Sequence, residues 1–300
     1  GPKPSVTDAA GQIQFTVTNR VNEVVTFTAT DVTDGDLPVP GNVQVTWNGT
    51  STSCVGAPPV AQDGYAVTPF ANGFVAQNFF YGNVNWNGCP GASVPAFRGG
   101  DVFIADFATG GFYRFDVNGG AVSSADLLNT LGKTIHFPVV GKDGKLYAAF
   151  GSSGAGGATG SIVEVDPTDG TVVRTLAANQ KCPAGLAVDP LSGDLFFTGD
   201  CFGGLEDPVV HRIRDPESAS PTLENYATLS ATPSGVIAFA PNGTLYVATQ
   251  YTATNPPVVR IAGTDKPSPT QTVVAGVSSI FWVTVGAADA AGEATALLGL

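Results

Sequence analysis

The stretch GLAVDPLSGDLFFTGD, residues 185–200, recurs in related form several times along the chain. It combines a short apolar strand, a turn built on glycine with Asp, Asn or Pro, and a second apolar strand. Related stretches are GYAVTPFANGFVAQNF from residue 64, VPAFRGGDVFIADF from 94, VVGKDGKLYAAF from 139, GVIAFAPNGTLYVATQ from 235 and FWVTVGAADAAGEATALLGL from 281. The large side chain of the second strand returns every 44 to 51 residues, at Phe103, Tyr147, Phe196, Tyr246 and about Leu297. The chain therefore repeats one supersecondary unit.

Each repeat continues with further strands. A third strand is predicted at GFYRFDV (111–117), SIVEVDP (161–167), VVHRIRDP (209–216) and PVVRIAG (257–263). A weaker fourth is predicted at TVVRTLA (171–177), ENYATLS (224–230) and QTVVAGV (271–277). Four strands per period predict propeller blades, because one such sheet cannot bury both faces alone and stacks on its neighbours. Six segments predict a six-bladed ring, which is either cut short at Leu300 or closed with strands from the first segment.

Two of the repeats resemble a known family. PAGLAVDPLSGDLFFTGD (183–200) and PSGVIAFAPNGTLYVATQ (233–250) are similar to the blade motif of NHL and SMP-30/gluconolactonase-like propellers. SMP-30-like lactonases hold a divalent cation in the central channel with Glu, Asn and Asp, so the resemblance implies a candidate calcium site. Asp106, Asp200 and Gln250 follow second strands, and Asn78 has a similar place in the first segment. We favour the alternative that these residues cap strand ends and turns.

Composition agrees with an all-β fold. The 300 residues are 43% hydrophobic and only 13% charged, with 38 glycines and 22 prolines, which is typical of many strands and turns. The one helix we expect is SADLLNTLG, residues 124–132. The net charge of −12 argues against nucleic acid or an anionic membrane surface as a partner. No stretch is long and apolar enough to predict membrane insertion.

The N-terminal segment differs from the rest of the chain in its pattern of apolar and polar residues. Apolar residues alternate with polar ones at Ile13, Phe15 and Val17, at Val25, Phe27 and Ala29, and at Val43, Val45 and Trp47, which predicts three strands with one buried face each. TDAAGQIQFTVT (7–18) and VTFTATDVTDGD (25–36) resemble the second half of a bacterial immunoglobulin-like domain of the invasin type. We therefore expect a partial β-sandwich over 1–47, a linker over 48–62 and the propeller over 63–300. DVTDGD (31–36) resembles half of a calcium loop and could bind calcium between domains, but a solvated turn is the better interpretation.

Four cysteines, Cys54, Cys89, Cys182 and Cys201, lie outside any C-x-x-C spacing, and two histidines are too few to complete zinc sites. Disulfides are therefore favoured over zinc. Of three possible pairings, Cys182–Cys201 with Cys54–Cys89 is our first choice. Disulfides predict a secreted or cell-surface location, and the absence of a leader suggests a mature piece of a longer exported precursor.

Catalytic motifs are scarce. No G-x-S-x-G elbow or nucleotide fingerprint occurs, and the glycine-rich run 151–160 lacks the Lys of a phosphate loop, so it is interpreted as a blade loop. His136 could face the channel mouth as a base or ligand, although a structural histidine is preferred. His211 is expected on the surface or in packing.

Two classes of function follow. The first is a non-catalytic, adhesin-like module whose propeller binds a protein, glycan or surface polymer beside neighbouring immunoglobulin-like domains or subunits. Its predicted ligand-binding residues are Tyr81, Trp86 and Tyr251, which lie in segments that do not repeat. For Trp86, packing against the linker is an equally good interpretation. The alternative class is a lactonase- or lyase-like enzyme with a cation in the channel.

Overall fold

The computed structural model describes residues 23–27, 30–31, 37–38, 43–47, 68, 70–74, 78–81, 84–87, 95–106, 110–130, 134–151, 159–199, 207–230, 233–249, 257–264, 269–276, 282–288 and 294–299. The chain divides into two compact units, Gly1–Pro58 and Pro59–Leu300. The division falls within the stretch predicted as the linker.

The N-terminal unit contains two short antiparallel pairs. β1 (Glu23–Phe27) pairs with β4 (Val43–Trp47), and β2 (Thr30–Asp31) pairs with β3 (Leu37–Pro38). β1 and β4 are the second and third strands expected from the alternating pattern. The first expected strand, with Ile13, Phe15 and Val17, lies outside the described residues, as does most of 31–36. The immunoglobulin-like sandwich stays a prediction.

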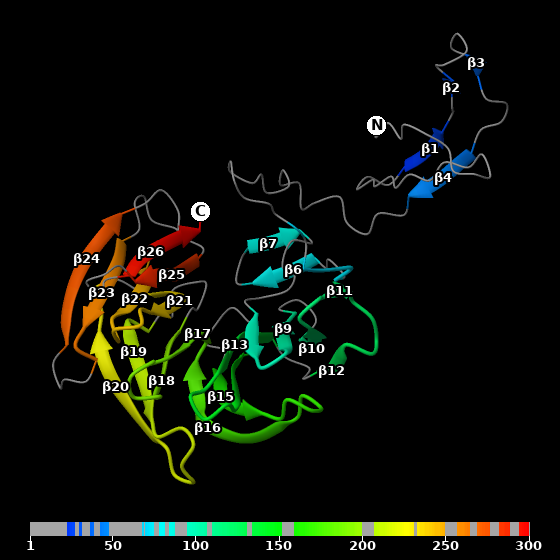
Figure 1. Ribbon diagram of the computed structural model, residues 1–300. Helices are drawn as coiled ribbons and strands as arrows, with labels where there is room; N and C mark the ends of the chain where they lie inside the picture. The colour runs from blue at the N-terminus through cyan, green and yellow to red at the C-terminus, as the bar shows by residue number, and fades with distance from the viewer. Residues whose placement is uncertain are drawn as a thin grey trace. The chain divides into compact units, whose positions relative to one another are not determined.

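Four consecutive four-stranded antiparallel sheets form the centre of the larger unit (Figure 1). The first blade consists of β8 (Ala96–Arg98), β9 (Asp101–Ala105), β10 (Gly111–Asp116) and β12 (Leu127–Thr130). The second consists of β13 (Thr134–Val140), β14 (Leu146–Gly151), β15 (Thr159–Val165) and β16 (Val172–Lys181). The third consists of β17 (Pro183–Val188), β18 (Leu195–Gly199), β19 (Val209–Arg214) and β20 (Thr222–Thr228). The fourth consists of β21 (Pro233–Phe239), β22 (Leu245–Thr249), β23 (Pro257–Ala262) and β24 (Thr270–Gly276).

The blades stack in chain order through their innermost strands. β13 packs against β8 and β9, β17 against β13, and β21 against β17. The hairpin of β25 (Trp282–Ala288) and β26 (Ala294–Gly299) follows, and β25 packs against β21. The strands predicted from the last four repeated segments are thus confirmed.

The recurring aromatic residue of each second strand explains why the motif repeats. Phe103, Tyr147 and Phe196 have no exposed surface, and each lies in a cluster shared by neighbouring blades. Phe196 meets Phe239 of the next blade edge to face, with ring centroids 5.1 Å apart. Burying such a side chain stabilises the fold by roughly 1.5–3 kcal/mol. Every blade interface needs one, so every repeat carries one.

The helix expected over residues 124–132 is wrong. Residues 124–126 form a turn, and Leu127–Thr130 is the outer strand β12, paired with β10. The Ser123 amide and hydroxyl both donate to the Asp126 carboxylate, at 2.8 and 2.6 Å, and fix the turn. A run this short is ambiguous in periodicity, and the open edge of β10 decides its conformation. None of the described residues is helical, so no helix among them could span a membrane.

The hairpin predicted within residues 64–79 is also not formed by the described residues. β5 (Ala71–Asn72) pairs in parallel with β11 (Gly120–Ala121), and β6 (Asn78–Tyr81) pairs with the later strand β7 (Val84–Asn87). Phe70 and Phe74 pack against the first blade through Phe115. This segment covers one face of that blade, a long-range contact that no local pattern specifies.

Candidate functional site

Each blade has two kinds of connection, and they lie at opposite ends of its strands. The tight turns from first to second and from third to fourth strand form what we call the turn rim. The connections from second to third strand, and those leading to the next blade, form the loop rim. Most residues of the second-to-third connections lie outside the described part of the chain, at 107–109, 152–158, 200–206 and 250–256.

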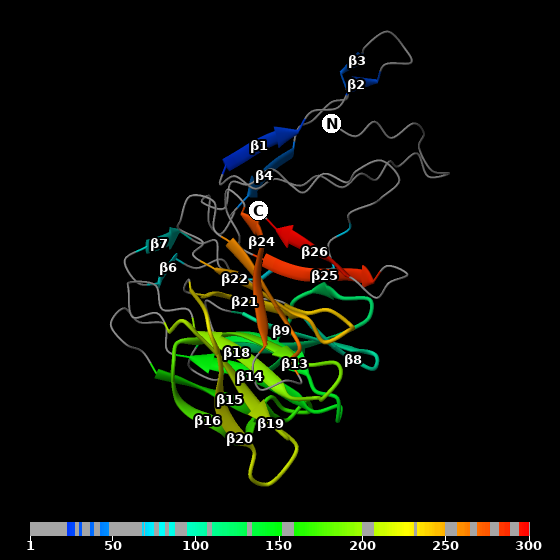
Figure 2. The same cartoon turned by 90° about the vertical axis from the view of Figure 1, so that its left-hand side faces the viewer.

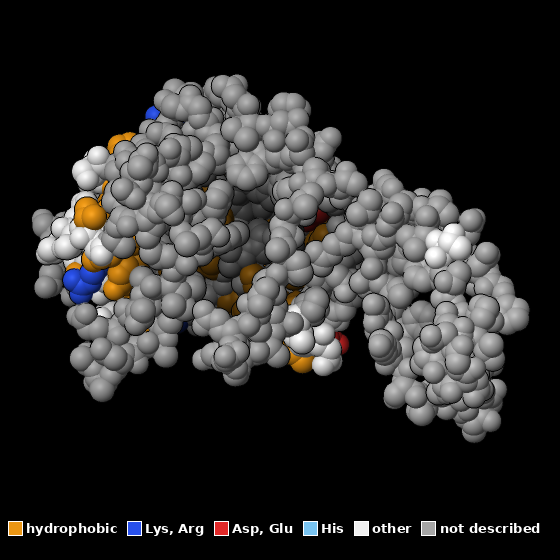
Figure 3. All heavy atoms as spheres, turned by 90° about the horizontal axis from the view of Figure 1, so that it is seen from above, with side chains coloured by type: hydrophobic (Ala, Val, Ile, Leu, Met, Phe, Trp, Pro, Cys, Tyr) orange, Lys and Arg blue, Asp and Glu red, His pale blue; other side chains and the backbone are white. Residues whose placement is uncertain are grey.

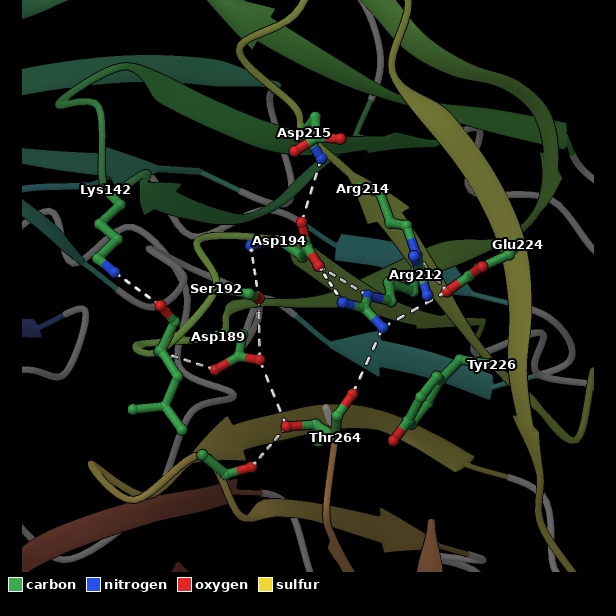
Figure 4. Close-up of polar contacts among 12 residues, drawn as sticks. Lys142, Asp189, Ser192, Asp194, Arg212, Arg214, Asp215, Glu224, Tyr226 and Thr264 are labelled. Carbon is green, nitrogen blue, oxygen red and sulfur yellow. Dashed lines mark hydrogen bonds and ion pairs between the residues drawn. The ribbon is translucent and has the colours of Figure 1, made fainter. Parts of the chain in front are cut away.

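At the turn rim, a buried arginine joins the third and fourth blades (Figure 4). Arg212 of β19 donates through Nε to Asp194 Oδ2 at 2.7 Å, and its Nη2 contacts the same oxygen. Its Nη1 donates to the Thr264 carbonyl of the next blade at 3.4 Å. Glu224 of β20 lies 3.6 Å from Nη1. The guanidinium is thus neutralised and bonded on several sides.

Asp189 makes a second link in the same network. Its Oδ1 accepts the Leu191 amide at 2.9 Å, while Oδ2 accepts the hydroxyls of Ser192 at 3.0 Å and Thr264 at 3.3 Å. Asp189 and Thr264 are each 2% exposed. Internal donors therefore occupy this carboxylate, and it is poorly placed to receive a ligand.

Equivalent links join the other described blades. Arg98 donates through Nε to the Gly144 carbonyl at 2.6 Å, and Lys142 donates through Nζ to the Leu191 carbonyl at 2.7 Å. Arg174 of the second blade donates to the Pro216 and Ser218 carbonyls of the third. Glu164, 2.6 Å from Arg174 Nε, raises the pKa of that guanidinium. The turn rim is a structural network that holds the blades in register.

At the loop rim, Asp106 is the described member of the predicted cation site. It follows β9 and is 1% exposed, and its amide donates to the Gly111 carbonyl at 2.8 Å. Asp200 and Gln250 lie outside the described residues. Asp106 comes three residues after Phe103, whereas Asp200 comes four after Phe196.

That difference of one residue matters, because successive side chains of a strand point to opposite faces. Counted from the recurring aromatic residue, Asp106 corresponds to Gly199 and not to Asp200. Asn78 begins β6 instead of following a second strand. Among the described residues, no group of three or more His, Cys, Asp or Glu could hold a metal ion. The cation site stays a prediction.

The structure describes only part of the predicted ligand-binding aromatic residues. Tyr81 is opposite Val84, and Trp86 is opposite Phe79, in the β6–β7 hairpin. Their side chains, and the whole of Tyr251, lie outside the described residues. Their role in binding stays a prediction.

His136, predicted as a base or ligand at the channel mouth or as a structural histidine, lies within the innermost strand β13, opposite Ala149. Phe137 follows with a φ of +39°, and the pairing shifts register between His136 and Val139. β17 and β21 shift register at the same end, between Pro183 and Gly185 and between Pro233 and Ile237. A bulge close to the loop rim is therefore common to three blades, and bulges redirect side chains.

His211 packs inside the third blade. Of the two environments predicted for it, the surface and the packed interior, the structure shows the second. Its ring stacks on Phe197 with centroids 4.8 Å apart, and Nε2 lies 3.2 Å from Asp207 Oδ2. Its Nδ1 is buried and has no hydrogen-bond partner among the residues that the structure describes. Sequence reasoning missed Asp207, because it precedes β19 and no motif marked it as a partner of His211. Nearby, Cys182 is disulfide-bonded, and the predicted partner Cys201 lies outside the described residues.

Comparison with known proteins finds similarity in structure alone. No protein-family model matches the chain, and no curated protein matches its sequence. A luciferin-regenerating enzyme is 15% identical with a TM-score of 0.50, over 65% of this chain and 66% of the other. A chain of the nidogen/laminin complex is 15% identical with a TM-score of 0.50, over 67% and 74%. The larger unit is a β-propeller.

A gluconolactonase from Xanthomonas campestris is 17% identical with a TM-score of 0.47, over 70% of this chain and 76% of that protein. The neighbours are NHL- and SMP-30-like propellers, as the blade motif suggested. This chain spans just under two thirds of the luciferin-regenerating enzyme, at 66%. At such identities the likeness concerns the fold, and function has to be argued from the site.

Proposed function

We propose that this chain is a non-catalytic, ligand-binding propeller module of an exported protein, and that its binding surface is the loop rim. One observation carries the proposal: side chains and carbonyls of the turn rim bond to one another across the blades, as Arg212 does between Asp194 and Thr264. A surface occupied in this way has few free polar groups for a partner. The second-to-third connections of the opposite rim differ in sequence from blade to blade, and binding residues of repeat folds are commonly found in such connections.

The ligand we propose is a neutral or cationic one, such as a glycan, a surface polymer or a basic protein segment. The net charge of −12 disfavours anionic ligands. Tyr81, Trp86 and Tyr251 combine apolar ring faces with a polar atom, which suits sugars and protein surfaces. The disulfide at Cys182 supports an oxidising, extracytoplasmic location.

The experiment replaces Tyr81, Trp86 and Tyr251 by alanine and measures binding to cell-wall and host-matrix glycans and proteins. We expect at least a tenfold loss of affinity at an unchanged melting temperature. The matched control is Phe97→Ala, which removes an aromatic that is 69% exposed next to a turn of the turn rim. Loss of binding in the control, with normal binding in the triple variant, would contradict the proposal.

A second function is favoured by Asp106, a nearly fully buried carboxylate at the loop-rim end of β9. In an enzyme of the lactonase or lyase kind, carboxylates there would supply oxygen ligands for a divalent cation. Metal analysis of the purified protein and lactone hydrolysis with added Ca²⁺, before and after Asp106→Asn, test this alternative. Stoichiometric metal lost in the variant together with activity would favour the enzyme over the binding module.

A further inference from the structure

The fourth strand of each blade is a sheet edge, and the register allows three of these edges to be compared position by position. Arg174 of β16 is opposite Glu164, Glu224 of β20 is opposite Arg212, and Thr272 of β24 is opposite Arg260. The second and third blades thus carry an ionised side chain where the fourth carries a threonine.

The residues next to these positions also distinguish β24 from β16 and β20. β16 exposes Val172 and Val173 immediately before Arg174, and β20 exposes Leu223 immediately before Glu224. In both strands an exposed apolar side chain is followed by a charge, which is how natural edges oppose strand pairing. β24 reads TQTVVAG and has no charge and no proline.

The residue at the β-bulge that follows these positions is also more exposed in the fourth blade than in the second and third. Leu176 of β16 and Tyr226 of β20 pack into the clusters between blades, and the Tyr226 hydroxyl donates to the Gly263 carbonyl at 3.3 Å. The corresponding Val274 of β24 is 45% exposed, and Val273 beside it is 60% exposed. Residues 270–274 are all exposed, although their side chains alternate between two faces.

The edge of β24 is open in the part of the chain that the structure describes. β24 pairs with β23 there and with no other described strand. Figure 2 turns this side of the molecule toward the viewer, with β24 in front. Figure 3 shows hydrophobic side chains exposed on the same side. Unpaired N–H and C=O groups along such an edge recognise an extended backbone.

We infer that β24 is a dimerisation edge, and that its partner is β24 of a second copy of this chain. Two identical strands can pair antiparallel about a twofold axis. The unpaired N–H and C=O groups of each strand then bond to those of the other. The chain carries a net charge of −12, yet this strand brings no like charges together. β-branched residues fill the contact, and such pairs stabilise antiparallel sheets. The inference does not depend on the ligand-binding proposal.

Sedimentation equilibrium of the full chain tests the inference. We expect the weight-average mass to rise from 30.4 kDa toward twice that value between about 1 and 100 μM. Val273→Lys should raise the dimer dissociation constant at least tenfold, because an edge lysine opposes pairing. The control Asn225→Lys changes the aligned position of β20, opposite His211, and should leave the association unchanged.

Three results would overturn the inference. The first is a wild-type mass of 30.4 kDa at every concentration. The second is a dimer that Val273→Lys leaves intact. The third is a dimer whose dissociation constant Asn225→Lys raises as much as Val273→Lys does, which would place the contact on another strand. Melting temperatures of both variants, expected to match the wild type, separate lost pairing from lost folding.

Discussion

Single side chains hold neighbouring blades together, and the burial of each one determines its contribution. Arg212 is 8% exposed and satisfies the buried Asp194, while Arg114 of the first blade is exposed and reaches the Pro167 carbonyl at 3.5 Å. Both arginines occupy the third strand of their blades, opposite the recurring aromatic. The same residue type thus has a structural role in one repeat and a peripheral one in another.

Arg212→Ala is expected to lower the free energy of unfolding by about 3–5 kcal/mol, because it leaves the Asp194 carboxylate buried without its partner. Arg114→Ala, the matched control, should change it by about 0.5 kcal/mol or less. Urea unfolding followed by circular dichroism measures both. Equal losses in the two variants would contradict this account of the network.

Tyr147 makes the free energy of unfolding depend on pH in the alkaline range. Burial, followed by the hydrogen bond from its hydroxyl to Asp143 at 2.9 Å, raises the pKa of Tyr147. A raised folded-state pKa means that the contribution is fully present below the ordinary tyrosine pKa of about 10 and is lost as pH rises above it.

Tyr147→Phe is accordingly expected to cost about 1 kcal/mol at neutral pH, the net value of one hydrogen bond. The difference from wild type should shrink and then reverse above pH ~10. Phe is sterically suited there, since Phe103 and Phe196 fill the same position in other blades. Unfolding measured from pH 7 to 11 checks this, with Tyr246→Phe as the control. A pH-independent difference would count against the role of the buried hydroxyl.

At the scale of elements, the face of the first blade is covered by a short segment paired in parallel, β5 with β11. Gly120 donates its amide to the Phe70 carbonyl at 2.9 Å, and Val122 donates to the Asn72 carbonyl at 2.8 Å. Gly119 permits this approach: its φ is +65°, and a Cβ there would lie 1.9 Å from the Phe70 carbonyl oxygen. The aromatic cluster of Phe70 and Phe74 depends on this contact.

Gly119→Ala should therefore break the β5–β11 pairing and cost about 1–3 kcal/mol, from backbone strain and the clash with Phe70. Hydrogen exchange at the Gly120 and Val122 amides should accelerate in the variant. Gly100→Ala is the control, because nothing lies within 4 Å of its added Cβ. Unchanged exchange at Val122 in the Gly119 variant would show that the pairing tolerates a side chain.

At the scale of the whole propeller unit, the two rims are unequal. The turn rim is bonded from blade to blade, from Arg98 through Lys142 to Leu191 and on to Thr264. Turns bonded from blade to blade allow the loops at the other end of the strands to vary without loss of the fold. The predicted disulfide Cys182–Cys201 would tie one of those loops to the innermost strand of its blade.

Peptide mapping without reduction is expected to recover Cys182 linked to Cys201 and Cys54 linked to Cys89. Cys182→Ser should lower stability by about 2–4 kcal/mol through the freed loop. Cys182 linked to Cys54 or Cys89 would contradict the pairing.

The blade architecture could be predicted from the spacing of residues along the chain. The period of Phe103, Tyr147, Phe196 and Tyr246 reports a packing problem that each blade solves locally, so the strands and their order could be predicted from spacing. The candidate site was less accessible. Asp106 could be named from its place after a strand, and its offset of one residue from Asp200 is visible in the sequence, but the spacing does not show which side chains meet in space.

Tertiary structure decided what depends on distant partners. Leu127–Thr130 is a strand because β10 offers an edge. Ala71–Asn72 pairs with β11, almost fifty residues away, because Gly119 leaves room for it. Asp189, Arg212 and Thr264 meet across two blades, 75 residues apart at the extremes. Local periodicity carries no information about such pairs, because their geometry exists only once the sheets have stacked.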